Sequence, residues 1–183
     1  MHASCRYIYL GLQLEKPQIH LFIGWESVEA HEAAKVAPGN AAASAAAFGP
    51  VSVPGSLTFV HTFFVSDPTP ALRAPVTEVA WFTLKDGASR ARAIALLDVV
   101  ARPNAAEAAR PDRRTFGAAW GEVVERPGRF CLVVGYASVA AHKSYVSSEP
   151  AVGKLLKTLV GLMDVEYGHV AFAPAARSPP NRL

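Results

Sequence analysis

The chain has 183 residues, 51% of them hydrophobic and 18% charged, which is enough apolar material for a sizeable core and too much for a disordered protein. Its formal net charge is only +3, and its basic residues cluster only at Arg110, Arg113 and Arg114. We interpret this cluster as a solvated loop rather than a nucleic-acid surface. The absence of a long apolar run and of a signal-peptide pattern predicts a cytoplasmic protein without membrane association. Two cysteines without a CxxC pattern, Cys5 and Cys131, fit a reducing compartment.

The first third of the chain predicts three strands and one helix. Residues 7–15 and 19–24 are interpreted as strands, and a helix is expected to begin near Ser27. Residues 57–65 are expected to form the last strand of this part. The Ala/Gly/Pro/Ser-rich stretch 36–56 between them predicts a long loop or a frayed helix.

The remainder of the chain predicts a β-α-β-β-α-β order. Ser138 is a plausible N-cap for the second helical region. Residues 66–75, with three prolines, read as a linker, and residues 174–183 as a disordered tail. The expected strands are 76–85, 116–125, 130–135 and 165–172, and the expected helices are 88–101 and the region from 139 to 163.

Two parts of the chain resemble each other in sequence. Gly24-Trp-Glu-Ser-Val-Glu-Ala-His31 and Gly135-Tyr-Ala-Ser-Val-Ala-Ala-His142 are identical at five of eight positions. Upstream, a Gly-x-x-x-Glu-basic-Pro pattern occurs in both, at 11–17 and at 121–127. Downstream, Phe59-Val-His61 matches Tyr167-Gly-His169. This self-similarity predicts a tandem repeat.

The repeat predicts an α+β fold of tandem ferredoxin-like units, with antiparallel sheets covered by helices. The complete unit would span 76–173. The other unit would span 6–65 and lack the first strand and first helix. A barrel with seven strands leaves an exposed edge, so we expect the chain to form a homodimer or else an irregular, partly open barrel.

The two strand-end segments and the Gly-x-x-x-Glu-basic-Pro turn resemble the dimeric α/β-barrel superfamily, in particular its antibiotic-biosynthesis-monooxygenase-like branch. The resemblance implies a ligand pocket between a sheet and its helices. It also implies an activity among cofactor-free oxygenation of aromatic polyketides, polyketide cyclisation, haem degradation, and chlorite or peroxide chemistry on haem. The haem-degrading branch is the poorest match, because residues 76–85 contain no Asn and no His follows His142 in its helix.

We therefore expect a cofactor-independent monooxygenase-like or cyclase-like protein that acts on a small aromatic or polyketide substrate. The alternative is a non-catalytic, stress-associated or small-ligand-binding α/β-barrel protein. No GxSxG, Walker A or GxGxxG motif supports a hydrolase, phosphate or dinucleotide site.

The candidate catalytic residues are His169, Tyr167 and His142. Strand alternation places Tyr167 and His169 on one sheet face, and imidazole suits acid–base chemistry because its pKa lies near neutrality. The alternative is that these histidines, like their counterparts His31 and His61, are structural.

Aromatic side chains and one further histidine are the candidate substrate-binding residues. The alternative interpretation of the aromatic residues is an ordinary core. No metal is predicted, because no two histidines stand at a typical ligand spacing in the sequence. The substrate-binding candidates are Trp81, Trp120, Tyr136, Trp25 and His61.

Overall fold

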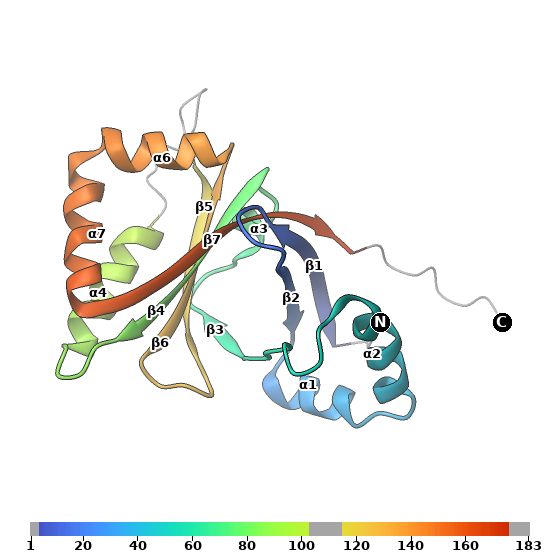
Figure 1. The fold of residues 1–183 in the computed structure, drawn as a ribbon. Coiled ribbons are helices and arrows are strands. Elements are labelled where there is room, and N and C mark those ends of the chain that lie inside the picture. Colours follow the sequence, from blue (N-terminus) through green and yellow to red (C-terminus); the bar gives the residue numbers. More distant parts are fainter. Residues whose placement is uncertain (1–3, 103–114, 176–183) are drawn as a thin grey trace.

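The computed structural model describes residues 4–102 and 115–175, and it has an α+β fold built on one curled sheet (Figure 1). All strand pairs in this seven-stranded sheet are antiparallel, and the strand order is β2-β1-β7-β4-β6-β5-β3. The arginine cluster at 110–114 and the tail from residue 176 lie outside the described residues. The strands are β1 (Cys5–Gln13), β2 (Ile19–Trp25), β3 (Thr62–Phe64), β4 (Val76–Leu84), β5 (Thr115–Val123), β6 (Arg129–Tyr136) and β7 (Met163–Pro174).

Helices lie at both ends of this sheet (Figure 1). Three helices, α4, α6 and α7, gather on one side of β4, β5 and β6, whereas α1 and α2 lie beside β2. Among the described residues, every helix is too short or too polar to cross a membrane. The helices are α1 (Val28–Lys35), α2 (Asn40–Phe48), the 3-10 turn η1 (Gly49–Val51), α3 (Thr69–Leu72), α4 (Arg90–Ala101), α6 (Val139–Ser148) and α7 (Pro150–Leu162).

The larger core cluster lies between the sheet and helices α4 and α7. Phe82 and Phe130 face these helices from the strands, while Leu97 and Leu159 face the sheet and are fully buried. Burial of such side chains contributes about 1.5–3 kcal/mol each, so this layer holds α4 and α7 on the sheet.

The opposite face of the sheet carries a second core cluster. It includes Val79 and Val133 from the strands and Leu72 from α3, which is completely buried. The segment expected to be a linker, 66–75, therefore contains a short helix that packs on the sheet. Thr77 secures this helix because its hydroxyl donates to the carbonyl oxygen of Ala71 at 2.7 Å.

Most predicted strands are confirmed to within a few residues, and the exception is the expected strand 57–65. Only Thr62–Phe64 forms a strand, β3, which pairs with β5. Because β5 ends at Val123, opposite Thr62, it does not extend alongside residues 57–60. The stretch 36–56 contains helix α2. The strands expected in separate sheets lie in one continuous sheet, because β1 pairs with β7 from Tyr9↔Pro174 to Gln13↔Val170.

Candidate functional site

The first group of interest is a buried histidine pair formed by α6 and β7. Ser138 caps α6, and its hydroxyl accepts a hydrogen bond from the backbone N–H of Ala141 at 3.0 Å. This cap places His142 in the first turn, above the face of β7 that carries His169. The Nδ1 atom of His142 lies 2.7 Å from Nε2 of His169. Two of the three predicted catalytic residues therefore contact each other directly.

A carboxylate from the loop after β1 holds the far side of this pair. The Nδ1 atom of His169 lies 2.5 Å from Oε1 of Glu15, and the backbone N–H of His169 donates to Oε2 at 3.0 Å. Partial burial opposes ionisation, but these bonds from His169 lower the pKa of Glu15 to about 2. An ionised carboxylate can only accept hydrogen bonds, so we infer that Nδ1 of His169 carries a proton and donates it in a hydrogen bond to Glu15. Nε2 of His169 then accepts a hydrogen bond from Nδ1–H of His142.

A second carboxyl group faces the other nitrogen of His142. Glu78 lies on β4 directly opposite His169, and its Oε2 is 3.6 Å from Nε2 of His142. The hydroxyl of Tyr136 donates to the same oxygen at 3.5 Å. Burial raises the pKa of Glu78 to about 7, although the bond from Tyr136 acts in the opposite direction. Burial and the neighbouring His169 lower the pKa of His142 to about 4.

Together these groups form a line, Glu15–His169–His142–Glu78, in which hydrogen bonds join the first three residues and a 3.6 Å contact separates His142 from Glu78. At its more exposed end Glu15 is ionised at neutral pH, its two imidazoles are hydrogen-bonded to each other, and at its buried end the carboxyl of Glu78 changes charge near neutral pH. A carboxyl with such a pKa is suited to act as a general base or acid at physiological pH.

Two tyrosines surround this line. The ring of Tyr136 stacks on His142 with centroids 4.5 Å apart, and Tyr167 meets His142 edge-on at 6.4 Å. Tyr136 is buried, which raises the pKa of its hydroxyl, whereas Tyr167 is 58% exposed. The structure thus brings Tyr136 and Tyr167 together with the two histidines. The sequence-based prediction missed Glu15 and Glu78.

A second histidine pair, built from the matching sequence positions, lies between α1 and the residues before β3. The Nδ1 atom of His31 is 2.8 Å from Nε2 of His61, and Nδ1 of His61 is 2.5 Å from Oε1 of Glu125. The backbone N–H of His61 donates to Oε2 of Glu125 at 2.9 Å. Trp25 stacks on His31 at 4.8 Å, as Tyr136 does on His142. Two of the predicted binding residues, His61 and Trp25, belong to this pair.

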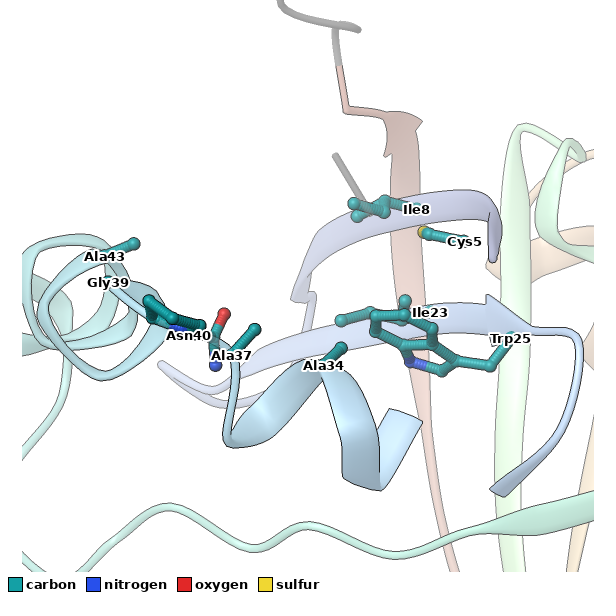
Figure 2. Close-up of a pocket in the computed structure, with 10 residues that line it drawn as sticks. Cys5, Ile8, Ile23, Trp25, Ala34, Ala37, Gly39, Asn40 and Ala43 are labelled. Atoms are coloured by element: carbon teal, nitrogen blue, oxygen red, sulfur yellow. The ribbon is translucent and has the colours of Figure 1, made fainter. Parts of the chain in front are cut away.

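A pocket of about 450 Å³ adjoins the second pair, between strands β1–β2 and helices α1–α2 (Figure 2). Trp25 and Ile23 project toward it from β2, and Ala34 and Ala37 face them from the helical side. Its lining is chiefly apolar, which suits a small hydrophobic ligand. Trp25 therefore both lines the pocket and contacts His31. The remaining lining residues are Cys5, Ile8, Pro38, Gly39, Asn40 and Ala43.

The other two predicted binding residues do not join either group. Trp81 lies on the opposite sheet face, where the guanidinium of Arg129 approaches its ring at 5.4 Å. Trp120 packs in the core beneath α4, and its indole N–H donates to Asp98 at 2.9 Å. Both cysteines are buried thiols, and burial raises the pKa of Cys131, which makes it a poor nucleophile.

Comparisons with known proteins identify the fold but no family. No family profile matches the chain, and no curated protein matches it. A protein described as a "putative monooxygenase" from Lactobacillus acidophilus NCFM is similar in structure, with a TM-score of 0.61 and 14% identity over 96% of this chain and 80% of that one.

Two further solved structures show the same fold. An "anthrone oxidase-like protein" matches with a TM-score of 0.64 and 14% identity, over 100% of this chain and 84% of that one. A "putative monooxygenase" from Fusobacterium nucleatum subsp. nucleatum ATCC 25586 matches with a TM-score of 0.59 and 7% identity, over 97% and 80% of the two chains. The chain shares an α+β fold with proteins described as monooxygenases or as oxidase-like.

Proposed function

We propose that the protein is a cofactor-independent monooxygenase that acts on a small aromatic or polyketide substrate. The observation that carries this proposal is Glu78, whose pKa of about 7 places a buried carboxyl beside His142 in its charge-changing range. The descriptions of the similar structures support the same class of reaction. Tyr167 and His169 stand two positions apart on β7 and therefore on the same sheet face, with their rings edge-on to each other. This arrangement supports a substrate that lies against the tyrosine ring.

In this reaction Glu78 removes a proton from an activated CH₂ group flanked by aromatic or carbonyl carbons. The resulting carbanion transfers electrons to O₂, and the net change is R₂CH₂ + O₂ → R₂C=O + H₂O. The residues of the protein need only position the substrate, take up the proton and exclude water. The proton stays on Glu78, because His142, with a pKa of about 4, is the weaker base. His142 stands 3.6 Å from this carboxyl, and Glu15 and His169 hold its tautomer.

Oxygen uptake with anthrone as the probe substrate tests this proposal. Glu78→Gln should reduce the turnover rate about a hundredfold, because the amide cannot accept the proton. The wild-type rate should rise with pH through about 7 as Glu78 ionises. Glu166→Gln is the matched control, because Glu166 lies on the adjacent strand with an 84% exposed side chain. Equal rates in wild type and Glu78→Gln would refute the role of Glu78.

The pocket at β1–β2 favours a second candidate function, the non-catalytic binding of a small apolar ligand. Its described lining residues bring no acid or histidine to it. An aromatic ligand should therefore change the fluorescence of Trp25. Ala37→Leu, which fills the pocket, should weaken binding about tenfold by removing contact area. Ala33→Leu, at an exposed position of α1, should leave it unchanged. Equal weakening by both substitutions would place the ligand elsewhere.

The proposal also covers the origin, the oligomeric state and the location of the protein. The matching histidine pairs and the adjacent strands β7-β4-β6-β5 support an origin by duplication of a ferredoxin-like unit in tandem. Leucines on the outer face of β1 and its loop are 45–60% exposed, and this apolar face supports a homodimer. The two buried thiols support a reducing, cytoplasmic location. The exposed leucines are Leu10, Leu12 and Leu14.

A further inference from the structure

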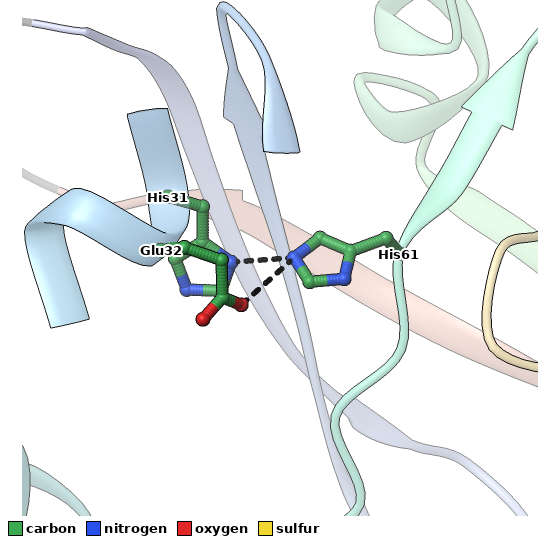
Figure 3. Close-up of side chains that lie close together, drawn as sticks. All are labelled: His31, Glu32 and His61. Atoms are coloured by element: carbon green, nitrogen blue, oxygen red, sulfur yellow. Dashed lines mark hydrogen bonds and ion pairs between the residues drawn. The ribbon is translucent and has the colours of Figure 1, made fainter. Parts of the chain in front are cut away.

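Three side chains with metal-binding atoms converge at the second histidine pair (Figure 3). His31 and Glu32 come from α1, and His61 comes from the chain just before β3. One ligand atom from each of them lies within 4.8 Å of the others. We propose that His31, Glu32 and His61 bind a divalent cation of the zinc class. This inference is independent of the reaction proposed at Glu78.

The distances require only small movements to enclose an ion. Nδ1 of His31 and Nε2 of His61 are 2.8 Å apart, and Oε1 of Glu32 is 3.9 Å from the same His61 nitrogen. Tetrahedral ligands with bonds of about 2.0–2.1 Å lie about 3.3 Å from each other. The two nitrogens must therefore separate by about 0.5 Å. The carboxylate must approach the His61 nitrogen by about 0.6 Å and must also close on His31, from which its ligand atom is at most 4.8 Å away. The carboxylate can move by rotation about its side-chain torsions, because the side chain of Glu32 is 49% exposed, and the partly exposed ring of His61 can move away from His31.

The outer contacts of the cluster favour a metal as well. Glu125 accepts a hydrogen bond from Nδ1–H of His61, which leaves the Nε2 lone pair directed at His31 and Glu32. A histidine that binds a metal through one nitrogen commonly donates the other N–H to a carboxylate, which orients the ring and increases its basicity. The stacked indole of Trp25 restricts the ring of His31 in a similar way.

The first histidine pair provides an internal contrast. His142 and His169 match His31 and His61 in sequence and contacts, but the residue after His142 is Lys143 where the other pair has Glu32. A lysine cation repels a divalent ion. His142 and His169 are also buried, whereas the side chain of His61 is 21% exposed and leaves room for a water ligand. Two histidines, one carboxylate and a water match an open zinc site.

Lys35 is the competitor for Glu32. Its ammonium nitrogen lies 3.0 Å from both oxygens of Glu32 in the structure. A cation at the cluster must share this carboxylate with Lys35 or displace it. Lys35→Gln should therefore tighten metal binding, which is a prediction that a purely structural role for Glu32 does not make.

Calorimetric titration of Zn²⁺ into tag-free, chelator-treated protein tests the proposal, with Co²⁺ as a visible-absorption probe of tetrahedral nitrogen and oxygen ligands. One ion should bind per chain. His61→Ala should abolish this binding, Glu32→Gln should weaken it at least tenfold, and Glu125→Gln should weaken it about 10- to 100-fold. His142→Gln is the matched control and should bind Zn²⁺ as the wild type does.

Glu32→Gln and Lys35→Gln keep the test decisive if His61→Ala does not fold, because both positions are exposed. Weaker binding in Glu32→Gln and tighter binding in Lys35→Gln support the site. The proposal is overturned if the wild type binds no ion, or if binding is unchanged in Glu32→Gln. A loss of binding in His142→Gln alone would assign the ion to the other pair and equally overturn it.

Discussion

The Glu78→Gln variant should be about 3 kcal/mol more stable than the wild type at pH 8 and nearly as stable as the wild type at pH 4.5. The side chain of Glu78 is only 15% exposed, and its charged form has no cationic partner among the groups that perturb it. Ionisation of this carboxyl in the folded protein is therefore costly. Glutamine has nearly the same shape and carries no charge at any pH.

The pH dependence follows from the direction of the pKa shift. Burial raises the pKa of Glu78 from 4.5 to about 7, so between these values the folded protein binds more protons than the unfolded chain. The stability contributed by the protonated carboxyl is fully present below pH 4.5 and is lost as the pH rises through about 7. One pKa unit corresponds to about 1.4 kcal/mol, which gives the expected difference between the two pH values.

Urea unfolding at both pH values measures this effect. The groups with lowered pKa values, His142 and Glu15, lose stabilising influence as the pH falls, but they are present in both proteins and cancel in the comparison. Glu166→Gln is the matched control, because its side chain is 84% exposed on the neighbouring strand. A Glu78→Gln effect of the same size at pH 4.5 and pH 8 would show that Glu78 ionises normally. If Glu78→Gln is more stable than the wild type and also turns over more slowly, Glu78 serves the reaction rather than the stability of the fold.

The strands and the histidines could be predicted from the sequence because their signals are local. Runs of β-branched and apolar residues predict β4 and β6, and Ser138 predicts the start of α6. The histidines are candidate functional residues because they recur at matching positions. Their pairing could not be derived, because His142 and His169 are 27 residues apart and meet only through the packing of α6 on β7.

The two carboxylates were missed for different physical reasons. Glu15 reaches His169 from 154 residues earlier in the chain, and its recurrence as Glu125 was interpreted as a turn. Glu78 did leave a signal, since an isolated acid in a strand of apolar and β-branched residues requires a partner or a proton. The candidate binding residues Trp81 and Trp120 lie on opposite sheet faces, because Trp81 and Gly121 both stand opposite Cys131. The register between two strands depends on residues far apart in the sequence, so it cannot be predicted from either strand alone.

Glu15→Ala should destabilise the protein by about 3 kcal/mol, and Glu125→Ala by about 1 kcal/mol. Each carboxylate accepts one hydrogen bond from a histidine ring and one from the backbone N–H of the same histidine. The two sites therefore differ mainly in burial. His169 is 2% exposed, so removal of Glu15 leaves two donors without a partner or water. Each unsatisfied buried donor costs about 1–3 kcal/mol.

Glu125→Ala is the matched control for this argument. The side chain of His61 is 21% exposed, so water can replace the carboxylate that this substitution removes. Urea unfolding of both variants at pH 7 measures the difference, and Glu15→Gln, which keeps one acceptor oxygen, should lie between wild type and Glu15→Ala. Equal losses in Glu15→Ala and Glu125→Ala would show that burial of the histidine does not decide the cost. A larger loss at Glu15 would instead show that the segment after β1 stabilises the buried histidine pair on β7, so that residues from both ends of the chain build one site.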